Sequence, residues 1–112
     1  MIRTVLPLVC LSVAACGVTR DSYPDHYASV WCDRLKECDR GLYELRFDGR
    51  TECEDQIAAD VEEGLQLAEH DLGCTLDLDQ SVDCLRAVRK ASCGEFVLGD
   101  FGGQCDVALV DC

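Results

Sequence analysis

The sequence predicts an all-α fold, a small disulfide-stapled bundle of about three helices with an irregular C-terminal tail. Three observations support this fold class. Apolar residues recur every three or four positions in three stretches, helix-capping and helix-stopping residues flank those stretches, and ten cysteines occur among 112 residues. A chain of this length forms one small domain, and small exported domains often supplement a marginal core with disulfides.

The first helix is predicted to start near Tyr23 and to continue to Cys38, before Gly41. Ser22-Tyr23-Pro24-Asp25 has the spacing of a capping box, and a proline is tolerated in the first turn of a helix. The apolar stripe consists of Tyr27, Val30, Trp31, Leu35 and Cys38. We expect Trp31 to pack in the core, although an aromatic side chain at a binding face is the alternative.

A short extended segment is predicted next, because apolar and charged residues alternate over residues 43–47 before the Asp48-Gly49 turn. The second helix is predicted to run from the capping box Thr51-Glu52-Cys53-Glu54 to Gly73. Its apolar stripe consists of Cys53, Ile57, Val61, Leu65, Ala68 and Leu72.

The third helix can be capped by Asp77 or Asp79, and Gly94 is expected to end it. Its apolar stripe consists of Val82, Leu85, Val88 and Ala91. The acidic residues 77–83 also have the spacing of a calcium loop, but valine replaces the glycine of the sixth position and the glutamate of the twelfth. Helix capping is therefore the better explanation. Residues 95–112 contain three glycines and are predicted to be irregular.

The N-terminus carries a targeting signal, because Arg3 precedes an apolar run over residues 5–15 that ends in small residues. This run is too short to span a bilayer, which requires about 20 apolar residues. Val13-Ala14-Ala15-Cys16 resembles the lipobox of bacterial lipoproteins, in which a signal peptidase cuts before the cysteine and that cysteine carries the lipid. The resemblance implies a signal peptide at residues 1–15, a short lipidated tether at residues 16–22 and a single cysteine-rich helical domain at residues 23–112.

Ordinary secretion is the alternative, because Val13-Ala14-Ala15 also satisfies a small-x-small cleavage rule. The cysteine count favours lipidation of Cys16, since loss of Cys10 and acylation of Cys16 leave an even number that can pair completely. The predicted disulfide cysteines are Cys32, Cys38, Cys53, Cys74, Cys84, Cys93, Cys105 and Cys112. In the enterobacterial sorting pattern that the signal resembles, Gly17 after the lipidated cysteine favours the outer membrane.

Helix geometry restricts the pairing of these cysteines. Cys32 and Cys38 in the first helix are separated by about 9 Å along the axis, and Cys84 and Cys93, both placed in the third helix, by about 13.5 Å. Bridged cysteines need Cα atoms within about 7 Å, so neither pair is expected to bond. An antiparallel hairpin of the first two helices would instead bring Cys38 close to Cys53, and we predict that bond.

The exported domain is strongly acidic, because all 22 acidic residues follow Cys16 and Arg3 is the one basic residue that precedes it. Nucleic acids and anionic lipid surfaces are bound through basic patches, and the sequence shows no Lys/Arg cluster that could neutralise them. Neither is expected as a partner. The acidic charge is explained by a solvated surface, with a face that binds a cation or a basic protein as the alternative.

No catalytic residue, metal ligand or cofactor is predicted, and no small-molecule substrate is indicated. His26 and His70 are isolated in the sequence, and the chain has no Cys-x-x-Cys, Gly-x-Ser-x-Gly or His-Glu-x-x-His motif. His70 falls near the end of the second predicted helix, where the helix dipole explains a histidine without any further function.

The lipobox, the helix with Cys32 and Cys38, and the later helix that ends in cysteine and glycine look like the small cysteine-rich lipoproteins that some Gram-negative bacteria encode in many copies. The resemblance implies a disulfide-stapled envelope protein and no particular activity. We therefore expect a lipid-anchored, non-enzymatic envelope protein that acts as a binding or structural module, held to the membrane through the lipid on Cys16. The alternative is a small inhibitor or immunity-type protein directed against a basic secreted enzyme or toxin.

Overall fold

The computed structural model describes residues 17–112, so the predicted signal peptide and the predicted lipidation site Cys16 lie outside the described residues. The described part of the chain is mostly helical and contains one pair of two-residue strands, and four disulfides cross-link it. The predicted all-α, disulfide-stapled fold is confirmed. The elements are α2 (Tyr23–Cys38), α3 (Arg40–Arg46), α4 (Arg50–Asp71), β1 (Thr75–Leu76), α5 (Leu78–Lys90), α6 (Cys93–Leu98) and β2 (Leu109–Val110).

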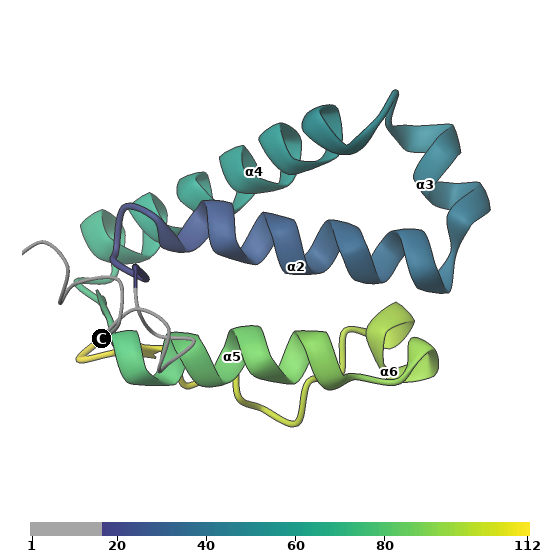
Figure 1. The fold of residues 1–112 in the computed structure, drawn as a ribbon. Helices are drawn as coiled ribbons and strands as arrows, with labels where there is room; N and C mark the ends of the chain where they lie inside the picture. The colour runs from purple at the N-terminus through teal and green to yellow at the C-terminus, as the bar shows by residue number, and fades with distance from the viewer. Residues whose placement is uncertain (1–16) are drawn as a thin grey trace, which may run out of the picture.

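Helix α2 lies between the two other long helices (Figure 1). The chain returns along one side of α2 as α4, which is antiparallel to it, and then runs along the other side as α5, parallel to α2. The tail passes back along α5, and β2 pairs antiparallel with β1, with Thr75 opposite Val110 and Leu76 opposite Leu109. Among residues 17–112, no helix is both long enough and apolar enough to cross a membrane.

Two clusters of buried side chains form the core. The larger cluster joins α2 to the first half of α4, the second half of α5 and α6, and its most deeply buried members include Ala28, Cys53 and Val88. The smaller cluster lies where the chain enters α2 and includes Val18, Tyr23 and Leu65. Trp31 is half-buried, and its ring centroid lies 5.5 Å from that of Phe96, in agreement with its predicted place against the core.

The predicted N-terminal capping boxes of the first two helices are wrong. The Ser22 hydroxyl does not cap α2, because it donates to the Gly17 carbonyl at 2.7 Å and accepts from the Thr19 amide. Helix α4 begins at Arg50, before the predicted Thr51 cap, and Gly49 precedes it. The third prediction is confirmed, since the Asp77 carboxylate accepts from the Gln80 amide at 2.9 Å and caps α5.

The extended segment predicted over residues 43–47 is wrong for residues 43–46, which belong to α3, while Phe47 is the extended C-cap residue of that helix. The Asp39 carboxylate accepts from the Leu42 amide at 3.0 Å and starts this helix, so Gly41 lies inside it. Tyr43 and Phe47 are both buried while Leu45 is 83 % exposed. The spacing that matters is therefore four residues, which is one helical turn, and not the alternation of a strand.

Helix α5 ends before Gly94, the predicted stop, because Ala91 caps it and Ser92 opens a new helix. Ser92 and Glu95 form a reciprocal capping box, with distances of 3.1 Å and 2.8 Å between the bonded atoms. Cys93 is consequently the first residue of α6 and not part of the third helix. The predicted irregular tail thus contains α6, which ends at Gly99 in the left-handed conformation, and the short strand β2.

Candidate functional site

The eight predicted disulfide cysteines are all bonded in the described part of the chain, as Cys32–Cys53, Cys38–Cys93, Cys74–Cys112 and Cys84–Cys105. The predicted absence of Cys32–Cys38 and Cys84–Cys93 bonds is confirmed. The predicted Cys38–Cys53 bond is wrong. Because α3 separates α2 from α4, it is Cys32, further back along α2, that faces Cys53 at a Cα distance of 6.2 Å.

Residues 17–22, which the sequence predicts to be a tether, are packed onto the helical domain. Val18 is only 7 % exposed and belongs to the smaller core cluster. The Arg20 guanidinium donates to both oxygens of Glu62 and to both oxygens of Glu69, at distances from 2.6 to 3.0 Å. Arginine is suited to this arrangement because its planar guanidinium can bind carboxylates in a bidentate manner. The segment therefore has little freedom relative to α4.

The electrostatics of this contact favour the ionised carboxylates. Glu62 and Glu69 lie seven residues apart, two turns along one face of α4. The hydrogen bonds from Arg20, with a further one from Gln66, lower the pKa of Glu62 to about 2. The hydrogen bonds from Arg20 also lower the pKa of Glu69. Both carboxyl groups are therefore more easily ionised than an isolated glutamate.

The docked segment places Gly17 beside the groove between α2 and α5. His26 Nε2 lies 3.3 Å from the Gly17 carbonyl oxygen. His26 also lines a small cleft of about 50 Å³ together with Arg86 and Arg89 of α5. Arg89 lines the neighbouring part of the same groove with Arg34 of α2. Basic side chains from two helices thus follow this groove, starting next to the residue that succeeds the predicted lipidation site.

Arg34, Arg86 and Arg89 line this groove, and Lys90 lies one helical turn after Arg86, on the adjoining surface of α5. We refer to these four cations as the basic face. Arg86, Arg89 and Lys90 are exposed, and they are neighbours on α5 because they lie three and four residues apart. A basic cluster is therefore present, contrary to the expectation from the sequence. Residues 86–90 carry three of its cations, and the fold adds Arg34 from α2.

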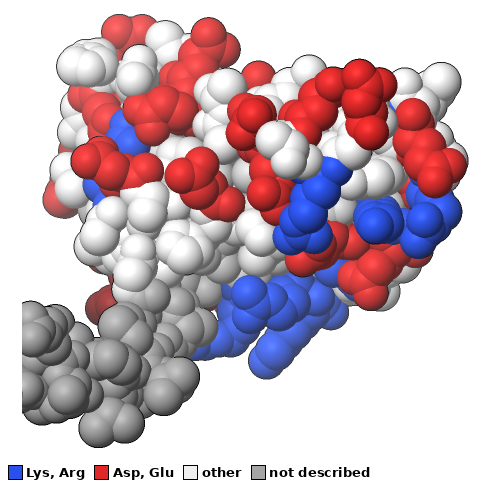
Figure 2. All heavy atoms as spheres, turned by 45° about the horizontal axis from the view of Figure 1, so that its top comes forward, with Lys and Arg blue, Asp and Glu red and all other residues white. Residues whose placement is uncertain are grey.

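The opposite charge gathers on α4, which has eight acidic residues and one arginine. Its exposed carboxylates Glu52, Asp55, Asp60 and Glu63 follow one side of the helix, and we refer to these four as the acidic face. In Figure 2 acidic residues cover much of the upper surface, whereas a contiguous basic area lies along the lower edge, on the side of α5. The domain is therefore electrically asymmetric.

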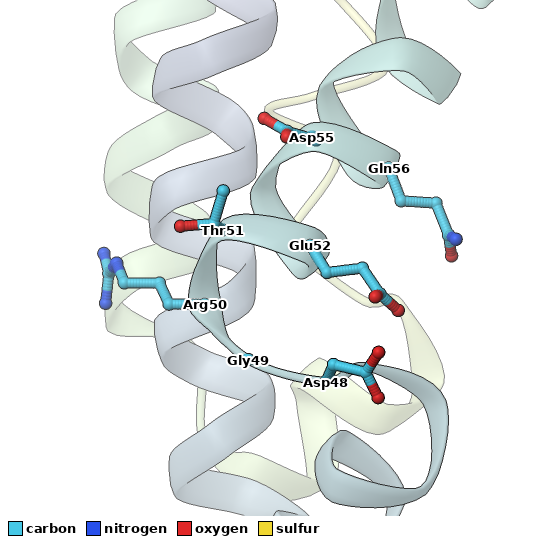
Figure 3. A pocket seen from close by; sticks show the side chains of 7 residues that line it. All are labelled: Asp48, Gly49, Arg50, Thr51, Glu52, Asp55 and Gln56. Atoms are coloured by element: carbon cyan, nitrogen blue, oxygen red, sulfur yellow. The ribbon is translucent and has the colours of Figure 1, made fainter.

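A hollow with a volume of about 770 Å³ lies where α3 meets α4 (Figure 3). It is open to solvent, and its side chains do not converge: those of Asp48, Glu52 and Gln56 extend to one side while Arg50 extends to the other. Arg50 is held by Asp33 and by Glu54, the latter at 2.7 Å. This hollow therefore offers no paired acid and base.

The isolated histidines have separate positions, with His26 at the groove and His70 exposed in the last turn of α4. Over residues 17–112, no group of three His, Cys, Asp or Glu side chains lies close enough together to hold a metal ion. Comparisons of the chain with protein families, with curated proteins and with solved structures find no match. The chemistry that the surface offers is that of two oppositely charged faces on a rigid frame.

Proposed function

We propose that this protein is a lipid-anchored, non-enzymatic protein of the bacterial cell envelope that serves as a binding or structural module, with Gly17 favouring the outer membrane. The observation that carries the proposal is the docking of residues 17–22, which follow directly after the lipobox-like sequence. Val18 and Arg20 attach this segment to the core and to α4. A lipid on Cys16 would therefore hold the domain itself close to the bilayer, with a single peptide bond to Gly17 between them.

The cross-linked frame supports export and a passive role. Disulfides persist in oxidising compartments such as the bacterial periplasm. All eight cysteine sulfurs of the described residues are engaged in disulfides, so none of them offers a nucleophilic thiolate. A module of this kind would present fixed charged surfaces to a partner without a chemical step.

The anchoring is tested by expressing the full chain in a bacterial host that processes lipoproteins and by supplying an alkyne-bearing fatty acid. The wild-type protein should incorporate the label and should sediment with membranes, because two or more acyl chains hold a protein stably. Cys16→Ala should lose both properties. Cys10→Ala is the matched control, since Cys10 lies within the predicted signal peptide and its loss should change neither. An unlabelled wild-type protein whose mass shows no acyl group would overturn the proposal.

The second candidate, an inhibitor or immunity-type protein, is favoured by the acidic face of α4. Complementary charge accelerates association with a basic enzyme or toxin and contributes to specificity. The oxidised protein should capture a basic hydrolase or toxin from envelope or secreted extract and inhibit its activity. The variant Glu52→Gln/Asp55→Asn/Asp60→Asn/Glu63→Gln should lose this capture. Recovery of such an enzyme in equal amounts by the wild type and the variant would exclude the acidic face as the contact.

A further inference from the structure

We propose that the basic face lies against the anionic phospholipid headgroups of the membrane that holds the protein, and that it fixes the orientation of the anchored domain. The inference rests on the proposed function, because the lipid on Cys16 supplies the attachment. The basic face then decides which side of the domain is turned toward the bilayer and which side is presented to partners.

The position of the attachment point is the first argument. Consecutive Cα atoms are about 3.8 Å apart, so Cys16 lies within that distance of Gly17. The Gly17 carbonyl contacts His26, and His26 shares its cleft with Arg86 and Arg89. The lipid would thus enter the bilayer next to the groove that the basic face lines. Because Arg20 and Val18 hold residues 17–22 to the domain, the attachment point cannot move freely around the molecule.

The charges that remain available on this face are the second argument. Asp33 and Glu37 line the groove, and Asp83 lines the hollow beside Arg86. These three carboxylates are engaged in ion pairs with Arg50, Arg34 and Arg86 respectively. Glu95 and Asp100 line a hollow with Lys90, and each accepts a hydrogen bond from a backbone amide. Within the described residues, no carboxylate lies within salt-bridge distance of Arg89 or Lys90. These two exposed cations are free to meet phosphate groups, whereas Arg86 is paired with Asp83.

The distribution of the opposite charge is the third argument. The acidic face lies on α4, on the other side of α2 from α5 (Figures 1 and 2). Packed helix axes are about 8–10 Å apart, so the acidic face is more than one Debye length, about 8 Å in physiological salt, away from a surface that α5 touches. An orientation with α5 toward the membrane therefore brings the cations into the field of the lipids and keeps the acidic face out of it.

The attraction between these cations and anionic lipids is strong enough to orient an anchored domain but too weak to bind a free domain to the membrane. A Lys or Arg near an anionic membrane surface contributes about a fivefold preference, so the two unpaired cations Arg89 and Lys90 together give a preference of about twenty-five-fold. Such a preference would not hold a strongly acidic free protein on a membrane. For a domain already confined there by its lipid, it selects one orientation.

Arg89 and Lys90 also lie in the last turn of α5, where cations interact favourably with the helix dipole. That effect explains why cations occur at this end of the helix, and it does not depend on the lipid composition of a nearby membrane. Dependence on composition is therefore the property to measure.

The two lysines of the chain provide an internal measurement. Lys90 belongs to the basic face, whereas Lys36 lies in the last turn of α2 with its ammonium 5.9 Å from the centre of the Tyr43 ring of α3. The full acylated protein is reconstituted in vesicles of pure phosphatidylcholine or of phosphatidylcholine with phosphatidylglycerol. Both lysines are then labelled with a membrane-impermeant amine reagent, and mass spectrometry gives the ratio of the two rates. We expect phosphatidylglycerol to lower the Lys90 to Lys36 ratio at least fivefold, and salt at about 0.5 M to restore it.

Charge reversal tests the assignment of the face. Arg86→Glu/Arg89→Glu should abolish the effect of phosphatidylglycerol on the ratio. Arg40→Glu/Arg46→Glu is the matched control, because it changes the net charge equally at two exposed positions of α3 and should leave the effect intact. The mass of the oxidised protein verifies that all variants retain their four disulfides.

The outcomes separate this inference from the proposed function. A protein that carries acyl groups and floats with vesicles, but has the same labelling ratio in both compositions, overturns the orientation and leaves the anchoring in place. Loss of the effect in the α3 control as well as in the α5 variant would show that net charge and not the basic face is responsible. A protein without acyl groups would overturn both.

Discussion

Helices α4 and α5 lie on opposite sides of α2 but are attached to it in different ways. Helix α4 is joined to α2 by the Cys32–Cys53 disulfide and by the ion pair of Arg50 with Asp33, and Arg20 holds its second half to the segment before α2. No disulfide joins α5 to α2. Helix α5 is held to α2 mainly by apolar side chains such as Leu85 and Val88, with a hydrogen bond from Arg34 to the carbonyl of its C-cap residue Ala91.

The difference explains why the two helices have opposite outer surfaces. On the α4 side, Arg20 and Arg50 are engaged in ion pairs within the domain. The carboxylates of α4 that have no such partner make its outer surface acidic. The α5 side is held mainly by the hydrophobic effect, and its link to a charged group is the hydrogen bond from Arg34 to Ala91. Its cations Arg89 and Lys90 are therefore left at the surface, where they can interact with something outside the domain. We refer to the α4 side as the clamped side and to the α5 side as the packed side. The two should respond differently to mutation.

The largest effect is expected from removing the disulfide of the clamped side. The Cys32–Cys53 and Cys84–Cys105 bonds both span 21 residues, so loop entropy predicts the same loss of about 3 kcal/mol for each. Cys32→Ala/Cys53→Ala should nevertheless cost more, because both sulfurs are buried between α2 and α4, whereas Cys105 is partly exposed in the tail. Urea unfolding of the two double variants measures the difference. Equal urea midpoints for the two double variants would show that the disulfide of α4 contributes no more to stability than the disulfide of the tail.

The packed side should be most sensitive to a cavity. Val88 is fully buried in the larger cluster, and Val88→Ala should lower the free energy of unfolding by about 2 kcal/mol through lost burial and the cavity left behind. Val97→Ala is the control, because Val97 is 67 % exposed on α6 and its truncation should have almost no effect. A neutral Val88→Ala variant would mean that α5 is held by its links to the tail and not by packing on α2.

The three long helices could be predicted from the sequence because each has an apolar stripe of several turns. Helix α3 could not, because its short pattern at Tyr43 and Phe47 suits a strand as well as one helical turn. Without α3, the end of α2 would lie next to the start of α4, and this predicted neighbourhood led to the wrong Cys38–Cys53 pairing. Helix α6 has a readable signal in the sequence, because Ser92 and Glu95 have the spacing of a capping box and mark the start of a new helix.

The candidate surfaces were less accessible to sequence reasoning. A net charge is a sum over the chain and does not indicate that cations collect on α5 while carboxylates collect on α4. Residues 17–22 were interpreted as a tether because they are mostly polar and short. Their docking depends on Arg20 meeting two glutamates more than 40 residues away, a contact that only the tertiary structure defines.

A smaller, local effect is expected at that contact. Arg20→Ala removes four hydrogen bonds and leaves Glu62 and Glu69 to repel each other, so residues 17–22 should separate from α4 while the disulfide-linked bundle stays folded. Hydrogen exchange of the amides before α2 should accelerate severalfold, with unchanged exchange in α5. Arg20→Lys should restore only part of the protection, because an ammonium cannot bind both carboxylates in the bidentate manner of a guanidinium. Full protection in Arg20→Ala would show that Val18 alone fixes the segment.

The smallest effect is the pH dependence of the same contact. The pKa of Glu62 is lowered to about 2 and that of Glu69 is also lowered, both mainly through hydrogen bonds from Arg20. A carboxyl with a lowered pKa in the docked state stabilises docking fully above its undocked pKa, near 4.3, and loses that contribution as the pH falls toward 2. Exchange of the amides before α2 should therefore be constant from pH 7 to 5, after correction for intrinsic rates, and should accelerate between about pH 4 and 2. In Arg20→Ala this acidic transition should disappear, because neither glutamate then has a cation to hold it ionised. If the acidic transition persists in Arg20→Ala, it arises from other carboxyl groups on the α4 side and not from the contact of Arg20 with Glu62 and Glu69.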